Sequence, residues 1–564
     1  MSPRYGAASK PPDEAPALTV PGPRPVVWAP QARTLEVVLP RGAGLTPDDP
    51  DGSGAGTERR PLRLVGMDLP GWWSADDDLE PGTDYGYSVD GQRALPDPRS
   101  PRQPYGVLGW SRSFDPAFAW TDEAWEGPPA RGAVLEVDVA AFTAQGTLDA
   151  AVDRLDQLVD LGVALVELHT IGSVADVACP HLYTVREELG GPRALQRFVD
   201  AAHARGLGVS LGVAYHRAAP GASFLQSFAP YLAPLRARLR PPPTEHLADA
   251  PGPGDRAPTA SSPTPNGLVQ TAPVPSAPAS GRRINLDRAG SREVHDWITS
   301  SARRWFDDFH VDALHVAQVQ DLADASPVHV LAGVARVADA ASLAHGRPVR
   351  LAGECDTSDP RLLVPAEQGG RGLSQVRVHD VEHALSDLLA AGREDDPAWF
   401  GTLSRLLTSP DAGRTQVALG PASTGRTEHA DQPGQDDDSC AITAALVVAS
   451  GFVPRLTLRA PERLRSWWQK LLAARRTVAE DTPRVLHRGP NGVLLVHQGR
   501  LVTAVNTARQ PRSTLLPTSR RSWHPAAQWP AASTGTGHDG RPAASTSGSS
   551  LWLGARSAVV LVAR

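Results

Sequence analysis

Between residues 133 and 460 the sequence repeats one unit, in which a short run of small and β-branched residues is followed by an amphipathic helix. Strands that alternate with helices pair in parallel, and eight such units close into a barrel. We therefore predict a TIM (β/α)8 barrel over residues 108–460, with its functional groups at the carboxyl ends of the strands. The expected strands are 134–139, 163–168, 207–211, 309–318, 349–353, 416–419 and 452–456, with the sixth unassigned. The expected helices are 148–161, 194–204, 294–306, 328–344 and 381–391, with a further helix through Ala444.

Short strands separated by Asp, Gly and Pro turns flank the barrel on both sides. Residues 25–107 predict an N-terminal β domain, and residues 461–564 predict a Trp-rich helix followed by a C-terminal β domain. Three further stretches are crowded with Pro, Ala, Ser or Gly, a composition that does not support a packed core. They predict a disordered N-terminus (1–24), a disordered insertion in the barrel (240–282) and a low-complexity insertion in the last domain (517–550).

Composition excludes several classes of protein. The 564 residues carry a net charge of −6, which gives no basic surface for nucleic acid. No apolar run is long enough to span a membrane, and residues 1–21 lack the apolar segment of a signal peptide. Cys179, Cys355 and Cys440 are scattered rather than paired in a framework. We therefore expect a reduced, cytoplasmic protein.

The expected fourth strand contains a recognisable motif. His310-Val-Asp312-Ala-Leu-His315-Val-Ala317 resembles the strand-four motif Asp-Gly-x-Arg-x-Asp-Ala of the α-amylase superfamily of glycoside hydrolases. In that family the Arg and the second Asp, the catalytic nucleophile, point into the active site. The resemblance places His315 at the Arg position and Ala317 at the nucleophile position, so it implies a retained fold with a lost nucleophile.

Segments outside the barrel resemble one particular group within the α-amylase superfamily. Gly71-Trp72-Trp73 resembles part of the immunoglobulin-like N-terminal domain of glycogen-branching and debranching enzymes. The Pro-rich run over 95–107 is similar to a signature of one member of that group, the malto-oligosyltrehalose trehalohydrolases, which act in trehalose biosynthesis. The resemblance implies an immunoglobulin-like N-terminal domain and a β-sandwich at the C-terminus. It also implies a setting in α-glucan or trehalose metabolism.

The remaining family motifs are only partly kept. After strand three, Gly212, His216 and Arg217 stand where the family has Asp, Asn and His, while Tyr215 is retained. After strand five, Glu354 stands at the position of the general acid and is the one catalytic carboxylate that carries over.

Two further motifs complete the comparison. Asp380 and His383 match positions of the family's Asp-Phe-His-His motif, so the resemblance makes them, together with His315 and Tyr215, substrate-binding candidates. The third catalytic carboxylate falls at Ser423 and is lost. Residues 379–383 also fit an inverted zinc motif, but they lie where the amylase motif is expected, so we predict no metal and no cofactor.

Three functions remain open at this point. The first is a catalytically impaired homologue that binds an α-glucan or malto-oligosyltrehalose-type saccharide. The second is an active glycoside hydrolase in which Glu354 works with a displaced carboxylate, Asp356 or Asp380, as an inverting pair. The third is a structural protein that binds a protein partner in trehalose synthesis. We expect neither nucleic acid nor membrane as a partner.

Overall fold

The computed structural model describes most of the chain. The N-terminal stretch 1–22, the barrel insertion over 235–281, Cys179 and Ser423 lie outside the described residues, so the expectations placed on them are not taken further. The described residues are 23–41, 56–66, 69–172, 181–234, 282–390, 397–419, 437–458, 460–478, 482–487, 493–519, 521–530, 544–547 and 549–563.

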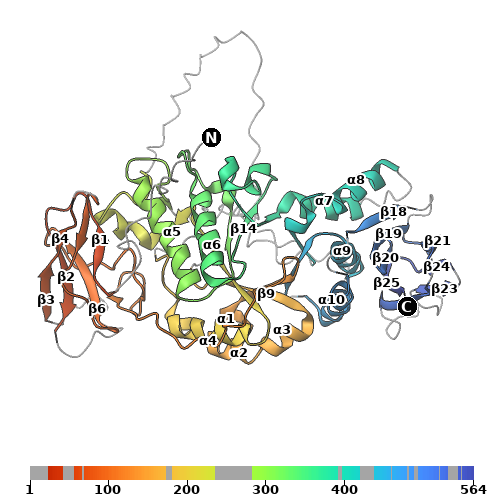
Figure 1. The fold of residues 1–564 in the computed structure, drawn as a ribbon, viewed down its shortest axis with the longest axis horizontal. Helices are drawn as coiled ribbons and strands as arrows, with labels where there is room; N and C mark the ends of the chain where they lie inside the picture. Colours follow the sequence, from red (N-terminus) through yellow and green to blue (C-terminus); the bar gives the residue numbers. More distant parts are fainter. Residues whose placement is uncertain are drawn as a thin grey trace, which may run out of the picture.

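Eight parallel strands close into a barrel at the centre of the molecule (Figure 1). Each strand pairs with the one that precedes it and the one that follows it, and the last pairs with the first, as the alternation of strands and helices predicted. The strands are β8 (Ala133–Asp138), β9 (Val163–His169), β10 (Gly208–Val213), β13 (Ala313–Val316), β14 (Arg350–Cys355), β15 (Gln375–Val378), β16 (Thr415–Ala418) and β17 (Val453–Thr457).

Helices cover the outside of the barrel. The helix expected over 148–161 is two helices, and buried apolar residues, Leu148 and Ala151 in the first and Leu155 and Leu158 in the second, continue across the break. No helix among the described residues is long and apolar enough to cross a membrane. The helices are α1 (Val139–Phe142), α2 (Leu148–Val152), α3 (Leu155–Leu161), α4 (Gly191–His203), α5 (Ser291–Asp307), α6 (Val330–His345), α7 (His379–Ala390), α8 (Pro397–Leu407), α9 (Asp437–Ala449) and α10 (Glu462–Arg475).

The unassigned sixth strand is β15, and it follows β14 without an α-helix between them. Two 3-10 turns, Pro360–Leu362 and Ala366–Gln368, make this connection instead. The strand escaped prediction because Gln375 and Arg377 alternate with valines, which does not read as a buried apolar run. Both polar side chains are nevertheless buried, and they bond to groups of the barrel itself.

Strand β13 is shorter than the ten residues expected over 309–318. His310 and Gln318 have φ angles of 52° and 47°, in the left-handed region. An extended chain cannot pass through that conformation, so the strand cannot reach either residue, and it covers Ala313–Val316.

Two small sheets form the N-terminal domain, of order β1-β5-β4 and β3-β2-β6-β7. The last strand extends past the expected limit at residue 107. Arg99 ties the domain to the barrel, because it donates hydrogen bonds to the hydroxyls of Tyr183 (2.9 Å) and Ser300 (2.6 Å). The strands are β1 (Val26–Trp28), β2 (Leu35–Pro40), β3 (Thr57–Pro61), β4 (Arg63–Leu64), β5 (Trp72–Ser74), β6 (Asp84–Val89) and β7 (Ser111–Arg112).

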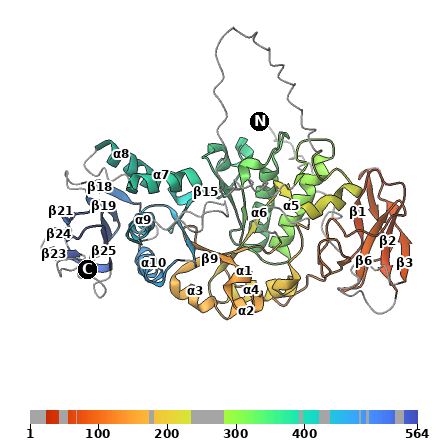
Figure 2. The same cartoon turned by 180° about the vertical axis from the view of Figure 1, so that it is seen from behind.

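The C-terminal domain also has two sheets, of order β18-β19-β20-β25-β22 and β21-β24-β23. Helices α9 and α10 lie between it and the barrel, as Figure 2 shows from behind. The prediction of a low-complexity insertion over 517–550 was wrong for β22, which contains the buried Ala527 and Trp529 and pairs with β25. The strands are β18 (Arg484–His487), β19 (Val493–Gln498), β20 (Leu501–Asn506), β21 (Arg512–Leu515), β22 (Trp523–Trp529), β23 (Ala544–Ser547), β24 (Ser550–Leu553) and β25 (Ser557–Ala563).

Candidate active site at the carboxyl ends of the barrel strands

The interior of the barrel changes from apolar to charged along its axis. An apolar layer lies toward the amino ends of the strands, and the side chains that follow it on the same strand faces are ionisable. Side chains two apart on a strand point to the same face, so one interior face supplies both layers. The apolar layer consists of Val134, Leu165, Ala313 and Val453.

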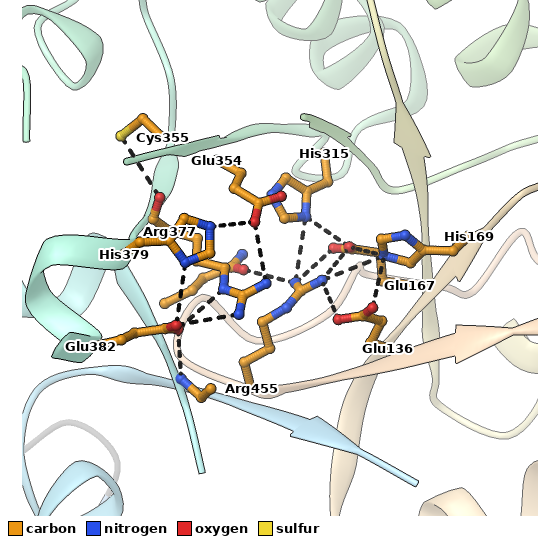
Figure 3. Close-up of polar contacts among 12 residues, drawn as sticks. Glu136, Glu167, His169, His315, Glu354, Cys355, Arg377, His379, Glu382 and Arg455 are labelled. Atoms are coloured by element: carbon orange, nitrogen blue, oxygen red, sulfur yellow. Dashed lines mark hydrogen bonds and ion pairs between the residues drawn. The ribbon is translucent and has the colours of Figure 1, made fainter. Parts of the chain in front are cut away.

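Arg455 of β17 organises the first group of charges. Its guanidinium donates to Glu167 (3.1 Å to Oε2) and to Glu136 (3.2 Å to Oε2), as Figure 3 shows. Arg455 and Glu167 are almost fully buried. Burial opposes ionisation of Glu167, but the charge of Arg455 outweighs it and holds the pKa of Glu167 well below its usual range. A buried ion pair therefore occupies the middle of the barrel.

His315, the residue at the family's Arg position, belongs to this buried group. Its Nδ1 lies 2.7 Å from Oε1 of Glu167, and its side chain is only 2% exposed. The Nε2 of His169 lies 2.7 Å from the same oxygen. A Cβ atom on Gly212 would lie 3.3 Å from the His169 ring, so the ring is packed close against this glycine, which stands at the position of a family Asp.

Glu354, at the general-acid position, lies in a second group of charges beside the first (Figure 3). His379 Nε2 donates to its Oε1 at 2.6 Å, and Arg377 Nη1 lies 3.4 Å from the same oxygen. Arg377 also donates to both oxygens of Glu382, at 3.1 and 3.2 Å. Nδ1 of His379 lies 3.6 Å from Oε2 of Glu382, so the four side chains alternate in charge around a closed ring.

This ring fixes the protonation of its members. Burial alone would raise the pKa of Glu354, but the hydrogen bond from His379 and the charge of Arg377 hold it well below its usual range. The hydrogen bond to Glu354 raises the pKa of His379 to about 9. Burial likewise opposes ionisation of Glu382, yet His379 and Arg377 lower its pKa to about 2. Glu354 is therefore a carboxylate, and His379 an imidazolium, at neutral pH.

The other predicted residues lie in different surroundings. Asp380 and His383 are exposed on the first turns of α7, and the Asp380 backbone N–H donates to the Asp356 carbonyl at 3.0 Å. Tyr215 is 1% exposed in the core, so it offers no surface to a substrate. Ala317 is half-buried just beyond β13. The structure brings Glu354 and His315 into the charged interior, but not Tyr215.

Sequence reasoning missed most of the charged interior. Each of the overlooked side chains lies on a barrel strand. A usable signal existed, because an ionisable residue two positions along a strand from an inward-facing apolar residue must itself face inward. The overlooked residues are Glu136, Glu167, His169, Arg377 and Arg455, while His379 and Glu382 were noted only as part of the discounted zinc motif.

No metal site is described. His310 lies near the amino end of β13 and contacts Asp122 at 2.9 Å, so it and His315 belong to different clusters. Across the described ranges, no three His, Cys, Asp or Glu side chains are arranged to hold a metal ion.

Comparison with known proteins gives a consistent set of relatives. The chain is 35% identical over 394 residues to malto-oligosyltrehalose trehalohydrolase of Arthrobacter ramosus, covering 68% of this chain and 58% of that protein. It is 35% identical over 368 residues to the trehalohydrolase of Rhizobium sp. (strain M-11), covering 64% of this chain and 53% of that one. The chain thus spans little more than half the length of these curated relatives. No family model matches it.

Solved structures support the same assignment at the level of fold. A pullulanase of Paenibacillus barengoltzii complexed with maltotriose aligns with a TM-score of 0.65 at 15% identity, covering 97% of this chain and 95% of that one. A pullulanase of Anoxybacillus sp. aligns with a TM-score of 0.64 at 13% identity, covering 98% and 88%. By sequence and by fold, the chain is a trehalohydrolase-like member of the α-amylase (glycoside hydrolase 13) superfamily.

Proposed function

We propose that this protein binds an α-glucan or a malto-oligosyltrehalose-type saccharide at the carboxyl ends of the barrel strands and does not hydrolyse it efficiently. One observation carries the proposal, namely that two cationic side chains, His379 at 2.6 Å and Arg377 at 3.4 Å, contact Oε1 of Glu354 and favour its carboxylate form. A general acid must hold a proton at the working pH in order to protonate the leaving oxygen. The contacts from His379 and Arg377 oppose such a proton on Glu354.

The nucleophile position supports the same conclusion. A retaining glycosidase needs a second carboxylate about 5–5.5 Å from the acid, and it forms the covalent intermediate. The family resemblance places Ala317 there, and a methyl group cannot attack an anomeric carbon. Loss of a nucleophile typically costs several orders of magnitude in rate.

Saccharide binding is the activity that the remaining groups can support. Glu354, His169 and Glu136 keep 20%, 32% and 34% of their side chains exposed, at the end of the barrel where TIM-barrel proteins bind their ligands. The curated relatives are named for a saccharide substrate, and one structural neighbour is complexed with maltotriose. We place this function in trehalose or α-glucan metabolism in the cytoplasm.

A working hydrolase is the second candidate. The ionised Glu354 suits a general base, and Asp356 and Asp380 are exposed close to it in the chain and joined by a backbone hydrogen bond. An inverting pair would need two carboxyl groups about 6.5–9.5 Å apart, one of them protonated.

The deciding experiment measures binding and hydrolysis on the same purified protein. Calorimetric titration with maltopentaose should give saturable binding, while incubation with malto-oligosyltrehalose should release no trehalose above background. Trehalose release that Glu354→Gln abolishes would establish the hydrolase instead. Binding of neither maltopentaose nor malto-oligosyltrehalose would reject both candidates and leave a protein-binding role to be tested by co-purification.

A further inference from the structure

The ring formed by Glu354, His379, Glu382 and Arg377 has a feature that the loss of hydrolysis does not require. Both contacts to Glu354 use its Oε1 oxygen, at 2.6 Å from His379 and 3.4 Å from Arg377. Within the described part of the chain, Oε2 of Glu354 makes no hydrogen bond, and the side chain is 20% exposed. One oxygen is therefore anchored while the other is available to a ligand.

His379 is itself held in place. Its Nδ1 lies 3.6 Å from Oε2 of Glu382, an ion-pair distance. Glu382 accepts two hydrogen bonds from Arg377 and a third, at 3.0 Å, from the backbone N–H of Ala418. Because both residues lie in the first turn of α7, the amino end of the helix also favours the Glu382 carboxylate. The imidazole is thus oriented by three elements, β15, β16 and α7.

We propose that His379 is a positioning residue that fixes Glu354 as a permanent hydrogen-bond acceptor, so that the general-acid position of hydrolytic relatives serves here to anchor a hydroxyl of a bound sugar. This inference rests on the proposed saccharide binding and assigns the anchoring contact within it. Hydrogen bonds to an ionised carboxylate are roughly twice as strong as those between neutral groups. The anchored Oε1 restrains the carboxylate, and the free Oε2 accepts the ligand.

The charges around the ring define the ligand class. Two carboxylates alternate with one guanidinium and one imidazolium, so the ring has no net charge to attract an ionic ligand. A neutral polyhydroxylated molecule, which offers hydroxyl donors and carries no charge, matches it. An α-glucan fits this description, whereas an acidic sugar would meet the Glu354 carboxylate with like charge.

The groups that face Glu354 all favour its ionised form. They come from four elements: Arg377 of β15, His379 of α7, His315 of β13 and Arg455 of β17. The contribution of Glu354 to saccharide binding should therefore stay constant between pH 5 and 8, because the acceptor does not take up a proton in that range. If His379 served only as packing, its removal would weaken saccharide binding equally at every pH.

The test uses calorimetric titration of the full-length protein with maltopentaose at pH 5, 6, 7 and 8. Wild type gives the reference dissociation constant at each pH. Relative to wild type at the same pH, His379→Phe should bind about ten- to hundredfold more weakly, and the difference should widen toward pH 5, because loss of the hydrogen bond from His379 leaves the burial of Glu354 less opposed and so raises its pKa. His379→Lys, which keeps a cation, should recover a flat profile. Asp387→Asn, on the exposed face of α7, is the control and should match wild type.

The outcomes separate this inference from the proposed function. Wild type that binds no maltopentaose overturns both. Wild-type binding that Glu354→Gln and His379→Phe leave unchanged, or that His379→Phe weakens equally at every pH, overturns the inference alone. Circular dichroism checks that each variant is folded. If His379→Phe does not fold, Glu354→Gln decides, with an expected loss of about tenfold or more for the same reason.

Discussion

Each end of the barrel holds a histidine between two carboxylates, but only one of these clusters faces solvent. At the carboxyl end, His379 lies between Glu354 and Glu382 with 12% of its side chain exposed. At the amino end, His203 lies between Asp122 and Asp312 with none of its side chain exposed. A histidine between two carboxylates therefore occurs once with access to solvent, in the open cluster around His379, and once fully buried, in the closed cluster around His203.

The closed cluster joins separate parts of the chain. Both ring nitrogens of His203 contact carboxylates, Nδ1 at 2.8 Å from Asp122 and Nε2 at 3.0 Å from Asp312. Asp312 is fully buried and also accepts from the Trp125 indole (2.9 Å) and from the guanidinium of Arg347. The segment that leads from the N-terminal domain into the barrel is pinned through Asp122 and Trp125.

The two clusters differ in whether they leave a polar atom available to a ligand. Every polar atom of Asp312 is satisfied by the protein, so nothing is left for a ligand. Glu354 is satisfied on one oxygen only. In TIM barrels the amino end serves stability and the carboxyl end serves function, and the two clusters divide in that way.

Removal of Asp312 should produce the largest effect on stability. Asp312→Ala leaves Arg347 and His203 buried without their carboxylate, and breaking a buried ion pair in this way costs about 3–5 kcal/mol. Glu354→Ala at the open end should cost about 1–2 kcal/mol, because water reaches the groups left behind. Urea unfolding followed by tryptophan fluorescence measures both.

Asp307→Ala is the control for the closed cluster, since Asp307 is 48% exposed and pairs with His345 on the surface. It should change the free energy of unfolding by about 0–1 kcal/mol. If Asp312→Ala cost no more than this control, or no more than Glu354→Ala, the contrast between the closed and the open end would be lost.

The pH dependence of stability gives a smaller effect. Because contact with Glu354 raises the pKa of His379 to about 9, the pair stabilises the folded state fully below the unfolded pKa, about 6.5. That contribution is lost as the pH rises through about 9. Its size is on the order of 1–2 kcal/mol after allowance for solvent screening.

Urea unfolding at pH 6, 7, 8, 9 and 10 measures this loss, and His379→Gln should remove it. His203→Gln should leave the His379 contribution in place, because the two clusters lie at opposite ends of the barrel. An unfolding profile of His379→Gln that still fell in parallel with wild type up to pH 10 would show that the open pair contributes nothing.

The fold could be read from the sequence wherever side chains followed a simple period. Strands such as β9 and β17 and the apolar face of α4 were predicted within a few residues. Strand β15 was not, because it packs Gln375 and Arg377 inward, where a buried strand is expected to be apolar. Strand β22 was hidden in a low-complexity stretch, although Ala527 and Trp529 alternate as a strand requires.

The candidate site was only partly predictable for a different reason. Glu354 could be placed by its motif, because its position depends on neighbouring residues in the chain. Its partners His379 and Arg377 lie 25 and 23 residues further on, and nothing local indicates that they turn toward it. Ionisation of Glu354 depends on those contacts, so the sequence could name the residue but not its protonation state.

Aspartate substitutions at two alanines, one in β13 and one just beyond it, should change the free energy of unfolding by very different amounts. The substitution at the open end should give the smallest effect of all. Ala313 lies in the apolar layer, 3% exposed, while Ala317 is half-buried beyond the carboxyl end of the same strand. Ala317→Asp should change the free energy of unfolding by less than about 1 kcal/mol, because the new carboxylate can reach water at the open end. Ala313→Asp should cost several times more, since it buries an unpaired charge.

Ala317→Asp should also release no trehalose from malto-oligosyltrehalose, because a restored nucleophile still faces a Glu354 that has no proton to give. Measurable release by this variant would show that Glu354 can be protonated during turnover, and that restoring the nucleophile is enough for hydrolysis despite the other substitutions.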